Sequence, residues 1–228
     1  MKKKDVKNAI RESLGLGEKT EVNEALVVQP KPFSIPTEGL SAENIKNHYS
    51  LYEQYGKDFN VISAELDGAN RANASSNHSA FRSLKIDEVY NLNATYLHEL
   101  YFANIGDLQS EITMDTLAFM RLERDFGSFD AWQMDFLACA QASRCGWVVT
   151  GFNVFTHTYM NYVVDLHSLN VPIGVIPVIV MDVWQHAYYK DYLKNVKEYT
   201  INMMKELNWN VIEQRFQRAD KIAQIVRS

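Results

Sequence analysis

The pattern of apolar and polar residues changes character twice along this chain, and the order of these changes constrains the fold most. Apolar residues recur at helical spacing from Ser41 to Ala142. β-branched and aromatic residues then dominate residues 146–166, and helical spacing returns after Asp182. Helices, one small sheet and helices again are typical of an α+β protein rather than of an alternating parallel sheet.

Residues that begin and end helices refine this prediction. Ser41 is a suitable N-cap for a long helical stretch that reaches Phe59, with Gly56 as an interruption. A second helical region is expected at about 86–104, and Gly106 should end it. The remaining expected elements are helices over 114–126, over 130–142 and from Asp182 onward, and three short strands over 146–150, 152–159 and 161–166.

The first 35 residues have a different composition from the rest. Lys7–Leu14 favours about two helical turns, and the prolines at 30, 32 and 36 then favour an extended path. We therefore expect an N-terminal arm (1–35), a hairpin of two long helices (36–108), and a C-terminal domain (109–228). In the last of these, a small three-stranded antiparallel sheet should be surrounded by helices.

Composition excludes several classes of function. The chain has 228 residues, of which 46% are hydrophobic, so it can bury a sizeable core. A net charge of −5 gives no electrostatic reason to expect binding to nucleic acid or to an anionic membrane. The longest apolar run, Val171–Val180, contains two prolines and is too short to span a bilayer. No apolar segment follows the basic N-terminus and only two cysteines are present, so we expect a cytoplasmic protein.

One spacing among the six histidines suggests chemistry. Asp182 and His186 lie four residues apart, directly after the apolar run, and both can point to one spot if Asp182 lies at a chain reversal. Imidazole and carboxylate ligands suit zinc, iron or manganese. Taken alone, the pair is equally explained by an N-capping Asp182 and a solvated His186.

Several motifs resemble the iron/manganese superoxide dismutases. Met181–Tyr189 (MDVWQHAYY) is similar to the family's motif D-x-W-E-H-A-[YF]-Y. Five further blocks occur in the family's order, and together the matches span roughly residues 41–216: Asn44–Tyr49, Asn93–His98, Phe126–Asp130, Gly146–Trp147, and Asn208–Trp209 with Arg215.

The resemblance implies a metal site and a reaction. Its four ligands would be His48, His98, Asp182 and His186, and they would hold one iron or manganese ion per chain with a further position for solvent. The implied activity is disproportionation of superoxide into O2 and H2O2. The implied assembly is a homodimer or a higher oligomer.

The resemblance also implies residues that surround the metal. The family hydrogen-bonds the metal's solvent with a Gln or a His, and the position of the Gln is Ala94 here. Residues 163–172 resemble the corresponding segment of the mycobacterial and archaeal-type enzymes, in which a His has this role. The resemblance therefore assigns the role to His167. Trp147, Trp184 and Tyr189 are the other residues expected around the site or at the dimer interface.

Three departures from the family affect this surrounding shell. Tyr52 and Gly56 occupy the positions of a His and a Tyr that line the substrate funnel, unless Tyr55 takes the second role from a shifted angle. Gln185 replaces the Glu that crosses the dimer interface, and it carries no charge. Phe102 replaces a Trp of the cavity wall.

These departures leave alternatives to a working dismutase. One is a dismutase-fold metal-binding protein with weak or no activity, which serves as a structural subunit of a larger particle with residues 1–35 as a docking arm. Another is a different redox enzyme that uses the same four metal ligands. The intact set of four ligands favours the dismutase.

Overall fold

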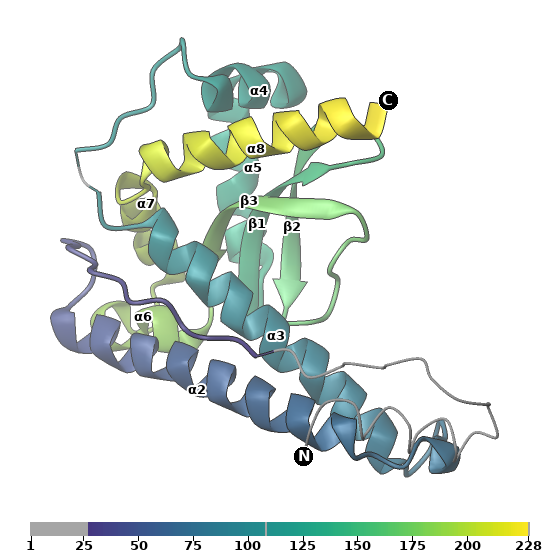
Figure 1. The fold of residues 1–228 in the computed structure, drawn as a ribbon. Helices are drawn as coiled ribbons and strands as arrows, with labels where there is room; N and C mark the ends of the chain where they lie inside the picture. The colour runs from purple at the N-terminus through teal and green to yellow at the C-terminus, as the bar shows by residue number, and fades with distance from the viewer. Residues whose placement is uncertain (1–26, 108, 228) are drawn as a thin grey trace. The chain divides into compact units, whose positions relative to one another are not determined.

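The computed structural model describes residues 27–107 and 109–227, which form two compact units. The larger unit contains residues 31–51 and the described residues from 96 onward, and the smaller unit contains residues 27–30 and 52–95. Two long helices, α2 (Ala42–Asp67) and α3 (Ala80–Asn104), each contribute residues to both units; Figure 1 shows the two helices. The predicted helix Lys7–Leu14 lies outside the described residues.

The larger unit contains a three-stranded antiparallel sheet in the order β2–β1–β3 (Figure 1). The strands are β1 (Gly146–Asn153), β2 (Thr158–Asp165) and β3 (Val175–Asp182). Trp147 on the central strand pairs with Val164 of β2 and with Asp182 of β3. Because paired residues on adjacent strands are neighbours, this register places Asp182 beside Trp147.

The structure corrects two of the three predicted strands. Residues 152–159 form the end of β1, a turn and the start of β2, because the Asn153 side chain accepts hydrogen bonds from the backbone N–H groups of Phe155 and Thr156. Of the segment predicted as the third strand, 161–166, residues 161–165 belong to β2 and residue 166 lies in the turn that follows it. The third strand is instead the apolar run that ends at Asp182, which is buried over its second half.

Five helices complete the larger unit: α4 (Leu117–Phe126), α5 (Phe129–Ala142), α6 (Gln185–Tyr192), α7 (Val196–Lys205) and α8 (Trp209–Arg227). α5 packs against β1 and β2, while α8 packs against β3. The core between them includes the fully buried side chains of Trp132, Phe136 and Phe216. The predicted α+β class is confirmed. Within the described residues, no helix combines the length and the apolar character needed to cross a membrane.

The smaller unit contains residues 52–67 of α2, residues 80–95 of α3 and a short 3₁₀ helix, η1 (Arg71–Asn73), between them. The expected interruption at Gly56 is wrong, because α2 continues through it. A Cβ at Gly56 would lie 2.8 Å from Cγ of Pro30, so the glycine makes room for the segment that precedes α2. The side-chain amide of Asn60 fixes the same segment through two hydrogen bonds with the backbone of Val28.

Candidate metal centre

The larger unit brings together the four residues predicted as ligands. His48 comes from α2, His98 from α3, Asp182 from the end of β3, and His186 from the first turn of α6. Their ligand atoms all lie within 4.8 Å of one another. Residues separated by up to 138 positions in the sequence therefore converge on one spot.

Local hydrogen bonds hold the elements that carry these ligands. Oδ1 of Asp182 accepts a hydrogen bond of 2.7 Å from the backbone N–H of Trp184, which closes the turn from β3 into α6. One helical turn before His48, the side-chain amide of Asn44 donates to the carbonyl oxygen of Ala187 and to Asp191. The start of α2 is therefore tied to α6, the helix that carries His186.

The three imidazoles face a single carboxylate oxygen. Oδ2 of Asp182 lies 3.0 Å from Nε2 of His48, 3.2 Å from Nε2 of His186 and 3.7 Å from Nε2 of His98. His48, His98 and Asp182 are buried, while 21% of the His186 side chain is exposed. The site thus combines a desolvated anion with three nitrogen donors.

Electrostatics keeps Asp182 ionised and His48 neutral, which are the protonation states that bind metals. Burial alone would raise the pKa of Asp182, but the neighbouring His186 and His48 more than offset it and hold that pKa below its ordinary value. Burial lowers the pKa of His48, and its hydrogen bond to Asp182 offsets this only in part. Among the described residues, no Lys or Arg forms an ion pair with Asp182. Three imidazoles and one ionised carboxylate fit a first-row transition-metal ion.

We refer to the four converging residues as the metal cage: His48, His98, Asp182 and His186. His167 lies beside this cage and is fully buried. Its ring centroid is 5.9 Å from that of His98, and its ring stacks on Trp184 at 5.0 Å. The indole Nε1–H of Trp147 donates a 3.0 Å hydrogen bond to Nδ1 of His167. Because an indole N–H can only donate, Nδ1 is the acceptor and the neutral ring carries its proton on Nε2. Burial, with a smaller contribution from His186, lowers the pKa of His167 to about 4.

Two buried tyrosines near the cage were missed by the sequence analysis. The ring centroid of Tyr101 lies 5.2 Å from that of His48, and its hydroxyl lies 3.3 Å from that of Tyr199. The Tyr199 hydroxyl donates a 2.7 Å hydrogen bond to the backbone carbonyl of Asp182. Tyr101 follows His98 by three residues on α3, so helical spacing places both on one face, and this pattern could have identified it.

The other predicted site residues are distributed as follows. Phe102 is buried and packs 4.9 Å from His48, centroid to centroid. Gln185 and Tyr189 are exposed on α6. Tyr52 and Tyr55 belong to the smaller unit, where the Tyr55 ring packs against Tyr90. The roles of Tyr52, Tyr55, Gln185 and Tyr189 therefore stay predictions.

The fold and the cage define an α+β protein with a buried three-histidine, one-aspartate metal site. A sequence model of the C-terminal domain of iron/manganese superoxide dismutases matches residues 115–215. An iron superoxide dismutase of Aquifex aeolicus is 34% identical over 200 residues, which cover 85% of this chain and 93% of the relative.

Similar proteins include superoxide dismutases that are named for iron and others that are named for manganese. An iron superoxide dismutase of Cupriavidus metallidurans is 31% identical, with 79% of this chain and 90% of the relative covered. A manganese superoxide dismutase of Mycolicibacterium smegmatis is 29% identical, with 77% and 84% covered. The chain belongs to the iron/manganese superoxide dismutase family.

Proposed function

We propose that this protein is a superoxide dismutase that holds one iron or manganese ion with His48, His98, Asp182 and His186. The observation that carries the proposal is the convergence of their four ligand atoms within 4.8 Å, around a buried carboxylate. Such an ion supplies, when bound, the one-electron redox chemistry that converts two superoxide ions and two protons into O2 and H2O2.

The chain's own residues set the conditions for this chemistry. Asp182 contributes the one negative charge of the cage, and the three imidazoles contribute neutral nitrogen donors. The rings of Trp147 and Phe102 pack against His98 and restrict access of water. His167 holds a proton on Nε2, since Trp147 occupies Nδ1. We propose that this N–H donates a hydrogen bond into the metal site and thereby adjusts the reduction potential of the metal. We assign to Tyr55 a smaller part in proton delivery.

The activity test pairs metal analysis with superoxide decay. Protein loaded with iron or with manganese should accelerate the decay of superoxide generated by pulse radiolysis, with a rate proportional to metal content. Measuring both forms also determines which metal supports turnover. Metal-loaded protein that leaves the decay at its spontaneous rate would favour a structural role for the fold.

We also propose that the protein forms a homodimer through the surface that contains Gln185 and Tyr189. Both residues are exposed on α6. Gln185 can accept a hydrogen bond but is uncharged, so Gln185→Glu should strengthen a contact with the imidazole of His186 in the second copy of the chain by supplying a charge-assisted hydrogen bond. Sedimentation equilibrium should show tighter association of the variant, by about tenfold. Monomers at all concentrations for both proteins would contradict this interface.

A further inference from the structure

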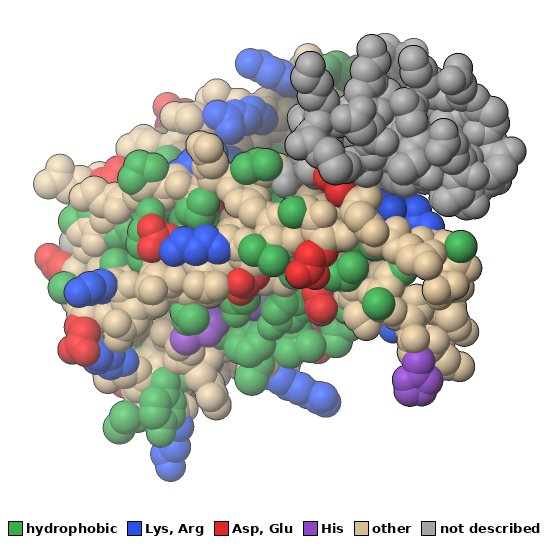
Figure 2. Space-filling model, turned by 60° about the horizontal axis from the view of Figure 1, so that its bottom comes forward, with side chains coloured by type: hydrophobic (Ala, Val, Ile, Leu, Met, Phe, Trp, Pro, Cys, Tyr) green, Lys and Arg blue, Asp and Glu red, His purple; other side chains and the backbone are tan. Residues whose placement is uncertain are grey.

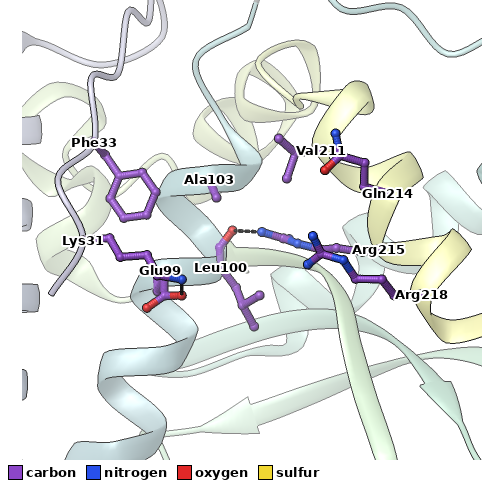
Figure 3. A pocket seen from close by; sticks show the side chains of 9 residues that line it. All are labelled: Lys31, Phe33, Glu99, Leu100, Ala103, Val211, Gln214, Arg215 and Arg218. Carbon is purple, nitrogen blue, oxygen red and sulfur yellow. Dashed lines mark hydrogen bonds and ion pairs between the residues drawn. The ribbon is translucent and has the colours of Figure 1, made fainter. Parts of the chain in front are cut away.

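The larger unit contains a cavity of about 210 Å³ whose lining residues include none of the four cage residues. Figure 3 shows its walls: the segment that precedes α2 contributes Lys31 and Phe33, α3 contributes Glu99, and α8 contributes Arg215 and Arg218. A cavity of this size has room for several water molecules or for a small organic molecule.

The charges around this cavity are unbalanced. Three cationic side chains line it together with a single carboxylate, that of Glu99. Glu99 forms an ion pair with Lys31. In the part of the chain that the structure describes, neither Arg215 nor Arg218 has a carboxylate ion-pair partner. The wall formed by α8 therefore presents two positive charges without matching anions.

Neutral acceptors hold the guanidinium of Arg215 in place. It donates hydrogen bonds to the carbonyl oxygens of Leu100 (2.9 Å) and Val178 (3.1 Å) and to Oδ1 of Asn104 (2.8 Å). Burial, with repulsion from Arg218, lowers the pKa of Arg215 to about 10, and Glu99 opposes this shift. A fixed, partly desolvated guanidinium beside a second cation would be stabilised by an anion.

The rest of the cavity lining is apolar. Phe33, Leu100, Ala103 and Val211 contribute hydrocarbon surface, and Phe33 is braced by Phe102, with ring centroids 6.0 Å apart. In Figure 3, Phe33 and Val211 lie beside the cavity, and the two guanidinium groups lie close together on one wall. An inorganic anion would use the charges but leave this apolar surface unfilled.

We propose that this cavity binds a small carboxylate with a short apolar body. Its carboxylate lies against Arg215 and Arg218, and its apolar part lies against Phe33 and Val211. Binding is noncovalent and does not depend on the dismutase reaction. The residues that decide it are distinct from the metal cage, so the two functions can be tested separately.

The test is a fluorine NMR titration of para-fluorobenzoate with metal-loaded protein at fixed ionic strength. Wild-type protein should show saturable binding. Arg218→Gln should weaken it by about tenfold, because one charged hydrogen-bond donor is lost. Arg218 is exposed and makes no hydrogen bond with the other described residues, so the variant should fold normally. Glu99→Gln should tighten binding, because it removes the one carboxylate of the cavity.

Lys221→Gln is the matched control. Lys221 is exposed on the same helix and does not line the cavity, so the same loss of charge should leave binding unchanged. If Arg218→Gln and Lys221→Gln weaken binding equally, the ligand is attracted nonspecifically to the charge of α8. If both variants bind as well as the wild type, the ligand binds elsewhere, for example on the metal. Inorganic phosphate that competes as strongly as unlabelled benzoate would show selection for charge alone. Each of these results would overturn the proposal.

Discussion

Replacement of Asp182 by Ala or by Asn should empty the metal site. Asp182 is the one anionic group of the cage, and its Oδ2 lies within 3.7 Å of all three imidazole Nε2 atoms. Residues that only support a ligand typically contribute 10–100-fold to metal affinity, so loss of the ligand itself should cost at least about that much. Elemental analysis of the purified variants should therefore find little iron or manganese, and superoxide decay should fall to the spontaneous rate.

The control for this prediction is Asp130→Asn. Asp130 is an exposed carboxylate in the first turn of α5, so its replacement should leave metal content and activity at wild-type values. Circular dichroism would show whether the Asp182 variants remain folded, with Asp182→Asn as the variant closer in shape. Folded Asp182 variants that retain a full complement of metal would contradict the assignment of the cage.

Replacement of His167 by Ala should leave the metal bound but reduce turnover strongly. His167 is not one of the four converging residues, so its loss removes no ligand. It is fully buried beside His98, and its Nε2 carries the proton because Trp147 donates to Nδ1. Loss of this N–H should lower the rate of superoxide decay by about 10–100-fold, the usual effect of a residue that supports a metal site. His167→Gln should retain part of the activity, because an amide N–H can serve the same position.

Two further variants separate this role from a purely structural one. Trp147→Phe keeps the ring packing but removes the donor to Nδ1, so it should lower the rate while leaving metal content unchanged. Tyr55→Phe should have a milder effect that is confined to high superoxide flux. Pulse-radiolysis rates normalised to metal content distinguish these cases. Wild-type rates in His167→Ala would contradict the proposed role of His167 in turnover and leave it a structural residue.

The fold class could be predicted from local patterns, and the positions of the four converging residues from the resemblance of short motifs to the iron/manganese superoxide dismutases. Ser41 directly precedes α2 and caps it as expected, with its Oγ accepting a hydrogen bond from the backbone N–H of Asn44. The Asp182–His186 spacing is realised by a turn that the Asp182 side chain itself closes. These features depend on residues close together in the sequence, where spacing is informative.

The errors arose where tertiary contacts decide the structure. Gly56 suggests a helix interruption, since glycine costs about 1 kcal/mol in a helix interior, but α2 continues through it. The glycine is needed there because a side chain would collide with Pro30. The run that forms β3 carries no alternation of polar and apolar residues, so its pairing with β1 had no local signal. The contact between Tyr199 and Asp182 joins α7 to the end of β3, and no spacing rule predicts it.

The proposed function requires that the four converging residues hold a redox metal that converts superoxide into O2 and H2O2. One measurement tests it most directly: the rate of superoxide decay against metal content, across wild-type samples with graded occupancy and the folded Asp182→Asn variant. The rate should rise in proportion to bound iron or manganese and fall to the spontaneous value in the variant. A spontaneous rate in fully loaded wild-type protein, or an undiminished rate in the variant, would contradict it.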